Sequence, residues 1–218
     1  MVVFHPETNC ECLFCPLRLC CIGLISNFAS SVQRYGSAEK GHSYHMFKEL
    51  LKALDAFLHC DKAHENSTRF IFVGVNADTE GYEIGEAAVK FCQEHADSTS
   101  MFNSVRREYY LGLMRNGVDL LVGNSSSGLY EMPSCKKPTV NIGNRQGGRL
   151  RAKSVVDTPG KASGEILDAI LKAKSLDCSN VVNPYGDGNS AASILKVLRS
   201  YRDFKLLLHK KWHEVVTH

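Results

Sequence analysis

Two short apolar runs, each followed directly by a turn of small polar residues, constrain the fold of this chain most strongly. Leu120, Leu121 and Val122 precede Gly-Asn-Ser-Ser-Ser-Gly, and residues 138–142 precede Gly-Asn-Arg-Gln-Gly-Gly-Arg. Runs of this kind are typical of strands that are buried on both faces of a parallel sheet. Open α/β folds bind ligands outside the carboxyl ends of such strands. The sequence therefore predicts a parallel sheet in which two successive loops form a binding site.

Helical and extended patterns alternate along the rest of the chain. Apolar residues spaced for one helix face predict helices at residues 46–58, 84–92, 109–114, 164–174 and 189–200. Apolar runs predict strands at residues 2–4, 70–75, 100–105, 118–122 and 138–142. This alternation favours a doubly wound parallel sheet with right-handed crossovers. We therefore expect an α/β, Rossmann-like fold, with residues 1–218 in a single domain.

The first loop carries groups that suit a diphosphate. Ser125, Ser126 and Ser127 offer hydroxyl donors where a helix is expected to begin, and the N–H groups of a first helical turn attract anions. Glu131 accepts hydrogen bonds when ionised, which suits a ribose diol. Serine and asparagine are also ordinary helix N-caps, so these residues alone leave a purely structural role open.

The second loop adds arginines. Arg145 and Arg149 bring forked donors that match phosphate oxygens, and two glycines between them let the backbone come close to a ligand. Arg151 fits a solvated surface charge equally well. Together the two loops predict a site that holds a nucleotide diphosphate from both ends.

Three motifs resemble the carboxy-terminal half of UDP-N-acetylglucosamine 2-epimerases. They are Gly-Asn-Ser-Ser-Ser-Gly followed by Glu131, Thr-Val-Asn-Ile-Gly-Asn-Arg-Gln-Gly-Gly-Arg, and Asn-Pro-Tyr-Gly-Asp-Gly-Asn at residues 183–189. The hydrolysing branch is the better match, because the other branch usually has Asp-Ser-Gly-Gly and Thr-Glu-Arg-Pro-Glu at the two turns. With the stretch at about residues 10–41 set aside, the resemblance runs from about residue 2 to residue 198. It implies the second Rossmann-like domain of a GT-B-type fold.

The resemblance also implies residues of the sugar cleft. His5 and Asn76 match cleft residues of the family, and the backbone near Val105 matches a segment beside the uracil. Each also has an ordinary structural interpretation. A histidine after a strand is often structural, Asn-Ala-Asp is often a turn, and a valine is often core.

The UDP moiety is matched by four residues. The resemblance implies that Ser125 and Ser126 bind the diphosphate, that Glu131 holds the ribose, and that Arg145 contacts the nucleotide. The implied reaction eliminates UDP from UDP-N-acetylglucosamine (UDP-GlcNAc) to give a glucal, which is hydrated to N-acetylmannosamine, a sialic acid precursor. UDP-GlcNAc or UDP is therefore the expected partner, and neither a cofactor nor a metal is expected.

No catalytic residue is assigned. The proposed acid/base carboxylates of the family come from its amino-terminal domain, which nothing in this sequence matches. Asp78, Glu80 and Asp187 are expected to be loop carboxylates, and Asp187 is expected to order the turn at residues 185–188. Three alternatives remain: an epimerase half that requires a second domain, a non-catalytic nucleotide-sugar binding module, and a truncated product that binds nothing. A retaining glycosyltransferase of the same architecture is disfavoured by the Arg-Gln-Gly-Gly-Arg run.

The stretch at about residues 10–41 departs from the family, whose members join the flanking segments by a short loop. Its cysteines include a C-x-C-x2-C run at Cys10, Cys12 and Cys15, but no second ligand pair follows at zinc spacing. We interpret the stretch as a retained non-native insertion rather than a metal site or a membrane span. The cysteines outside it are scattered, as in a reduced cytosolic protein.

Charge and composition exclude several classes of partner. The 218 residues carry a formal net charge of only +3, and no basic block or aromatic series indicates nucleic acid or membrane binding. The first residues do not resemble a secretory signal, so a cytoplasmic location is expected. Members of the family often pair, so the resemblance leaves a homo-oligomer open, but the sequence does not give the oligomeric state.

Overall fold

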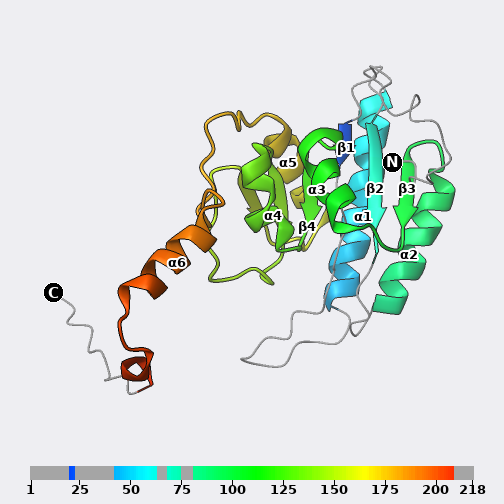
Figure 1. Cartoon of the computed structure of the whole chain (residues 1–218). Helices are drawn as coiled ribbons and strands as arrows, with labels where there is room; N and C mark the ends of the chain where they lie inside the picture. Colours follow the sequence, from blue (N-terminus) through cyan, green and yellow to red (C-terminus); the bar gives the residue numbers. More distant parts are fainter. Residues whose placement is uncertain (1–19, 23–41, 63–67, 75–80, 209–218) are drawn as a thin grey trace, which may run out of the picture. The chain divides into compact units, whose positions relative to one another are not determined.

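The computed structural model describes residues 20–22, 42–62, 68–74 and 81–208 (Figure 1). The chain divides into two compact units, Met1–Pro184 and Tyr185–His218. The interpretation of residues 1–218 as a single domain with an insertion stays a prediction. The expected strand at residues 2–4 lies outside the described residues.

Two three-stranded parallel sheets are formed by the described residues of the first unit. The first has the order β1-β2-β3, and its strands are Cys20–Ile22, Thr68–Val73 and Thr99–Phe102. The second has the order β4-β5-β6, and its strands are Leu121–Gly123, Thr139–Ile142 and Val155–Thr158. Every described strand pair is parallel, as the sequence predicted.

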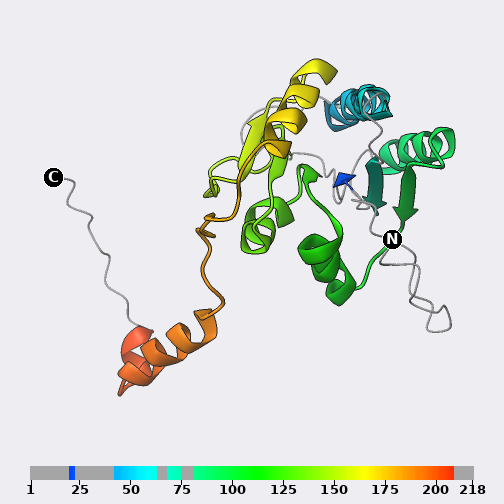
Figure 2. The same ribbon diagram turned by 90° about the horizontal axis from the view of Figure 1, so that it is seen from above.

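Helices cover both faces of this strand layer, as Figure 2 shows. One face carries the long helices α1 (His42–Lys62), α2 (Gly81–Glu94) and α5 (Ser163–Lys174). The other face carries short ones: α3 (Arg107–Gly112), the π-helix η2 (Leu113–Gly117), α4 (Ser127–Tyr130) and the 3-10 helix η3 (Met132–Cys135). The second unit contains α6 (Ser190–Ser200) and the 3-10 helix η4 (Phe204–Leu207).

Alternate strand residues supply two separate cores. Phe70 and Phe72 of β2 and Val122 of β4 belong to one apolar cluster with α1, α2 and α5. Ile71 of β2 and Leu121 of β4 point into a second cluster with the short helices. Successive side chains of a strand point to opposite faces, so both faces of the layer are buried. The doubly wound, Rossmann-like prediction is confirmed.

Two strands were not predicted. β6 lies at residues 155–158, where exposed and buried residues alternate over only four positions, too few for a clear apolar run. β1 lies at residues 20–22, inside the stretch interpreted as an insertion, and it pairs with β2. Cys-Cys-Ile is apolar, but a run of three residues is too short to distinguish a strand from a loop.

A carboxylate joins two of the long helices. Ala162, the residue before α5, provides no side-chain cap. Instead, Glu49 Oε2 of α1 accepts a hydrogen bond from the Ser163 N–H at 2.9 Å, and its Oε1 accepts one from Lys52 Nζ at 2.6 Å. The bond from Lys52, followed by the bond from Ser163, holds the pKa of Glu49 below its ordinary value despite its burial. An anion at a helix N-terminus stabilises the helix.

Candidate functional site

The first loop of the candidate site follows β4 and turns sharply into α4. Asn124 and Ser125 are buried, with exposed fractions of 1% and 3%, and Ser126 is half-buried. Ser125 Oγ accepts a hydrogen bond from the Ser127 N–H at 3.3 Å, and the Leu129 N–H bonds to the Ser126 carbonyl at 2.9 Å. The predicted helix start is confirmed: Ser126 is the N-cap residue of α4, and Ser127 is its first residue.

Helix α4 lies very close to β5. Thr139 Oγ1 donates a hydrogen bond to the Gly128 carbonyl at 3.0 Å. A Cβ atom added at Gly128 would lie 2.5 Å from Thr139 Cγ2, which is well inside normal contact distance. Glycine at position 128 therefore allows the serine turn, residues 125–127, to lie against the sheet.

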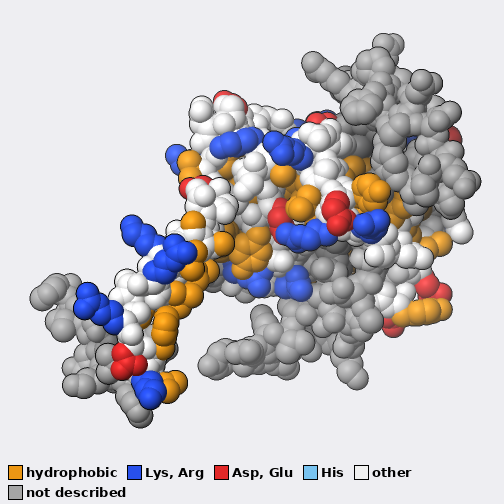
Figure 3. All heavy atoms as spheres, viewed as in Figure 1, with side chains coloured by type: hydrophobic (Ala, Val, Ile, Leu, Met, Phe, Trp, Pro, Cys, Tyr) orange, Lys and Arg blue, Asp and Glu red, His pale blue; other side chains and the backbone are white. Residues whose placement is uncertain are grey.

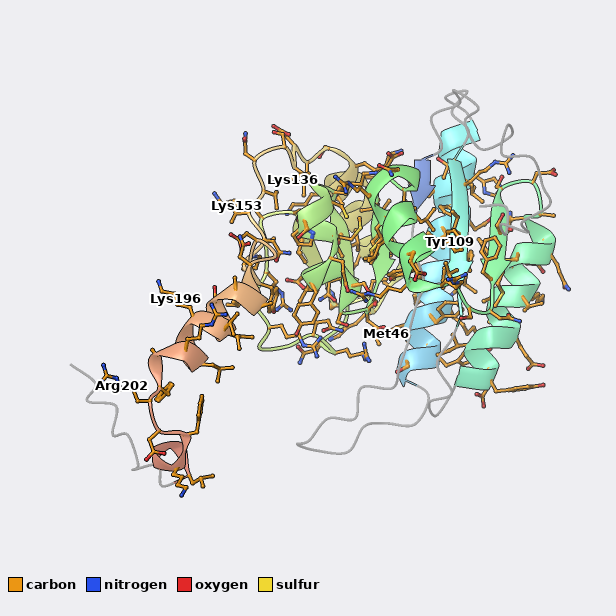
Figure 4. All side chains as sticks on the ribbon, in the orientation of Figure 1. Met46, Tyr109, Lys136, Lys153, Lys196 and Arg202 are labelled. Atoms are coloured by element: carbon orange, nitrogen blue, oxygen red, sulfur yellow. The ribbon has the colours of Figure 1, made fainter. Side chains whose placement is uncertain are left out.

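The second loop folds back onto the first. Arg145 Nη1 donates a hydrogen bond to the Asn124 carbonyl at 3.1 Å, and Gln146 Nε2 donates another to the same oxygen at 2.6 Å. The two loops expected at one edge of the sheet therefore meet, and the Arg145 guanidinium lies beside the serine turn. The start of the second loop also packs on α1, because a Cβ at Gly143 (φ +72°) would lie 2.9 Å from Sδ of Met46, labelled in Figure 4.

The other two arginines of this loop are held by defined partners. Arg149 Nη1 donates to Gln146 Oε1 at 2.5 Å, and its Cζ lies 5.3 Å from the centroid of the Tyr130 ring. Arg151 Nε forms an ion pair with Asp157 Oδ2 at 2.7 Å, and its Nη1 donates to the Arg149 carbonyl at 2.6 Å. Arg151 is exposed at the surface, and its guanidinium is paired with Asp157.

A polar row crosses the strands beneath this loop. Gly123, Asn141 and Asp157 are in register on β4, β5 and β6, and Asn141 Nδ2 donates to Asp157 Oδ1 at 2.6 Å. The side-chain oxygens of Asn124 and Asn141 are buried and have no hydrogen-bond partner within the part of the chain that the structure describes. The carboxyl edge of β4–β6 is therefore unusually polar for the interior of a parallel sheet.

The remaining predicted residues fall in three places. Glu131 is half-buried between α4 and η3, and its N–H bonds to the Ser127 carbonyl at 2.9 Å. Val105 follows β3, is half-buried, and packs against the second apolar cluster. Just beyond it, Arg106 Cζ lies 5.8 Å from the ring centroid of Tyr109 (Figure 4). His5 and Asn76 lie outside the described residues.

The loop carboxylates behave as expected where they are described. Asp187 Oδ1 accepts from the Asn189 N–H at 3.1 Å, and Oδ2 accepts from Asn189 Nδ2 at 2.9 Å. The bonds from Asn189 hold the pKa of Asp187 below its ordinary value. Its predicted role in ordering a turn is confirmed. Asp78 and Glu80 lie outside the described residues.

Two residues of the site were missed by the sequence analysis. Gln146 is buried, with an exposed fraction of 1%, and bonds to both loops. The ring of Tyr130 makes a cation–π contact with the Arg149 guanidinium. The Arg-Gln-Gly-Gly-Arg run contained the signal for Gln146, but a glutamine between arginines in a loop is normally exposed.

The described residues give little support to other kinds of site. Within residues 20–22, 42–62, 68–74 and 81–208, no group of three or more His, Cys, Asp or Glu side chains is placed to hold a metal ion. None of the helices in the described ranges is long and apolar enough to cross a membrane. Figure 3 shows basic and acidic side chains interspersed on the visible face of the first unit.

Comparison with known sequences decides the family. The profile described as UDP-N-acetylglucosamine 2-epimerase matches residues 38–199, most of the chain. The chain belongs to the UDP-N-acetylglucosamine 2-epimerase family. Polysialic acid biosynthesis protein P7 of Escherichia coli, a curated relative, is 36% identical over 172 residues, which are 77% of this chain. GDP/UDP-N,N'-diacetylbacillosamine 2-epimerase (hydrolyzing) of Campylobacter jejuni is 37% identical over 111 residues, 51% of the chain. The resemblance predicted from the motifs is confirmed.

The chain spans less than half the length of the curated relatives it matches: 41% of the E. coli protein and 27% of the C. jejuni protein. Solved structures agree on the fold. A co-structure of S. aureus MnaA with UDP has a TM-score of 0.62 at 15% identity, covering 88% of this chain and 48% of that one. Methanocaldococcus jannaschii UDP-GlcNAc 2-epimerase, in complex with UDP-GlcNAc and UDP, has a TM-score of 0.58 at 14% identity, covering 84% and 46%. The GT-B-type fold class is therefore confirmed for this family member.

Proposed function

We propose that this chain is the UDP-binding half of a hydrolysing UDP-GlcNAc 2-epimerase. The observation that carries the proposal is the hydrogen bond from Arg145 to the Asn124 carbonyl, which places the guanidinium beside the serine turn that precedes α4. A guanidinium beside hydroxyl and N–H donors at the carboxyl edge of a parallel sheet suits a diphosphate. Family membership agrees with this chemistry.

Each residue has a defined part in the proposal. Ser125, Ser126 and Arg145 bind the diphosphate, and Glu131, one turn further along, holds the ribose. Val105 follows β3, and in this proposal its backbone borders the uracil. His5 and Asn76 complete the sugar side of the cleft, as the family resemblance implies.

The proposed contribution of these residues to the reaction is electrostatic. Elimination of UDP places negative charge on the departing diphosphate, and fixed donors aimed at that charge lower the barrier. The serine turn and Arg145 are such donors, because the bonds to Asn124 fix their relative position before any ligand arrives. Proton transfer at sugar C2 is assigned to carboxylates of a second domain, as in the family.

The names of the relatives support a UDP-sugar as the substrate, but they differ in the sugar, which has to be identified by experiment. Their names include a GDP/UDP- and a UDP-N,N'-diacetylbacillosamine 2-epimerase, both described as hydrolyzing, and a UDP-N-acetylglucosamine 2-epimerase. UDP is common to these names. The nucleotide is therefore the part of the substrate to test first.

Calorimetric titration of UDP into the purified chain tests the proposal. We expect Arg145→Ala to weaken UDP binding by ten- to a hundredfold, because a hydrogen bond to a charged group contributes about 1.5–3 kcal/mol. Arg69→Ala is the matched control, because Arg69 is exposed and lies near the amino end of β2, whereas the candidate site lies at the carboxyl ends of strands. An unchanged dissociation constant for Arg145→Ala rejects the assignment of that residue.

A second experiment separates the alternatives of different class. The chain is incubated with UDP-GlcNAc, and the products are followed by NMR. Release of UDP and N-acetylmannosamine identifies an epimerase. UDP binding without turnover identifies a nucleotide-sugar binding module or a half that requires its second domain. Absence of both binding and turnover contradicts the proposed function.

A further inference from the structure

Gln146 is the most completely buried polar residue of the second loop, and both ends of its amide are used. Its exposed fraction is 1%. Nε2 donates to the Asn124 carbonyl at 2.6 Å, and Oε1 accepts from Arg149 Nη1 at 2.5 Å. Each amide atom requires a partner of one kind, so the side chain has one orientation that satisfies both.

These bonds form a continuous chain across the candidate site. It begins at the Asn124 carbonyl, where the serine turn starts, passes through the Gln146 amide, and reaches the Arg149 guanidinium. That guanidinium lies over the ring of Tyr130, which directly precedes Glu131. The loop before α4 is therefore connected to Tyr130, the last residue of α4, through the Gln146 amide and the Arg149 guanidinium.

We propose that Gln146 is a positioning residue that fixes the spacing between the serine turn and Arg149, so that both present donors to one diphosphate. The inference rests on the proposed function of this site, since it names Arg149 as a second guanidinium for the same ligand. Gln146 itself does not touch the ligand. It acts by holding Arg149 toward α4 and by holding the second loop to Asn124.

The geometry explains why glutamine fits this position better than its close analogues. A glutamate would keep an acceptor for Arg149 but would place a carboxylate oxygen against the Asn124 carbonyl. A methionine would preserve volume and flexibility but would leave the buried Asn124 oxygen with one bond fewer and release Arg149. Fixed donors bind a ligand more tightly than mobile ones, because less conformational freedom is lost on binding.

The test compares UDP with uridine, which lacks the phosphates. The dissociation constants of UDP and of uridine are measured by calorimetry for the wild-type chain, Gln146→Met and Gln146→Glu. We expect both variants to bind UDP about tenfold more weakly and uridine within twofold of wild type. Gln93→Met is the matched control, because it makes the same chemical change at an exposed position of α2. It should alter neither affinity.

A second set of variants guards against misfolding of the buried substitution. Arg149 is exposed, so Arg149→Met should fold, and it should show the same selective loss of UDP affinity. The double variant Gln146→Met/Arg149→Met should bind UDP with an affinity within about twofold of that of either single variant. The two losses should not add, because the residues act as one unit.

The outcomes are distinguishable. If the wild-type chain fails to bind UDP, the proposed function fails and this inference fails with it. If wild type binds UDP and Arg149→Met or Gln146→Met binds it equally well, only the positioning role is overturned. If uridine and UDP affinities fall together in Gln146→Met, Gln146 is a general structural residue and the inference is also overturned.

Discussion

The two faces of the strand layer in the first unit are built differently. One face is covered by helices of 21, 14 and 12 residues, α1, α2 and α5. The other is covered by pieces of six, five, four and four residues, α3, η2, α4 and η3. The long helices share a large apolar cluster with both sheets, and the short ones share a smaller one. Burial of apolar surface, and with it stability, is concentrated on the long-helix face.

The face covered by the short helices has more helix ends, and helix ends provide backbone groups that can bind a ligand. Every helix end leaves backbone groups without partners inside the helix, and these need side chains, other backbone groups or ligands. Around α4, Ser125 and Thr139 bond to backbone groups of the helix, and Arg145 and Gln146 bond to the Asn124 carbonyl in the loop before it. The difference between the faces therefore separates the part that stabilises the unit from the part that offers a binding site.

The largest expected effect tests the stabilising face. Phe57 of α1 is 3% exposed, and its ring lies 6.5 Å from that of Phe70 at the start of β2. Phe57→Ala should lower the free energy of unfolding by about 3–5 kcal/mol, because truncation leaves a cavity. Urea denaturation measures this loss. A drop in the UDP affinity of the folded protein by more than about twofold would show that the two faces are not separable.

The next effect tests the packing of α4 on β5. Gly128→Ala should destabilise the chain by about 1–3 kcal/mol, because the new methyl group would overlap Thr139 Cγ2. It should also weaken UDP binding, since the serine turn must move. Thr139→Ser in the same variant removes Cγ2 and keeps the hydroxyl, so it should restore part of both quantities, because contacts of 3.3 Å to Leu121 Cδ2 and to the hydroxyl oxygen remain. Failure of this rescue would disprove the close-contact explanation.

A smaller effect tests the link between α1 and α5. Glu49→Ala should cost about 1 kcal/mol in stability at pH 7, because α5 loses the acceptor at Ser163. The native pKa of Glu49 lies below its ordinary value. Its contribution is therefore present above the ordinary glutamate pKa of about 4.3 and is lost as the pH falls through the lowered native value. Unfolding curves of wild type and variant should converge on acidification; a constant difference would argue against the ionised link.

The smallest effect tests the contact between Tyr130 and Arg149. Tyr130→Leu removes the aromatic ring beneath the guanidinium, and a cation–π contact at an exposed site contributes about 0.5–1 kcal/mol. UDP affinity should fall about two- to fivefold, as measured by calorimetry. Tyr130→Phe keeps the ring and should bind as wild type does. An equal loss in both variants would point to the hydroxyl instead.

Much of the fold could be predicted from local patterns. The spacing of apolar residues on α1, α2 and α5 predicted helices within a few residues of their observed ends. β6 was missed, because four residues with a partly exposed pattern do not distinguish a strand from a loop. β1 was missed, because a three-residue strand is defined by its pairing with β2 rather than by its own sequence.

The candidate site was predicted less completely than the fold. Small polar residues after two apolar runs predicted that the loops would meet, and the bond from Arg145 to Asn124 shows that they do. The roles of Ser125, Ser126, Glu131, Arg145 and Val105 toward a ligand stay predictions. The pairing of Arg151 with Asp157 could not be predicted, because it depends on how far the loop folds back over β6.

The sequence by itself determined the family, the parallel α/β architecture and the two loops, because motifs, apolar periodicity and turn residues are local properties of the chain. Only the tertiary structure decided which groups of those loops bond to one another. The Asn124 carbonyl, the Gln146 amide and the Arg149 guanidinium come together because β4 and β5 are neighbours in register. Hydrogen bonds require distances and directions that spacing along the chain does not specify.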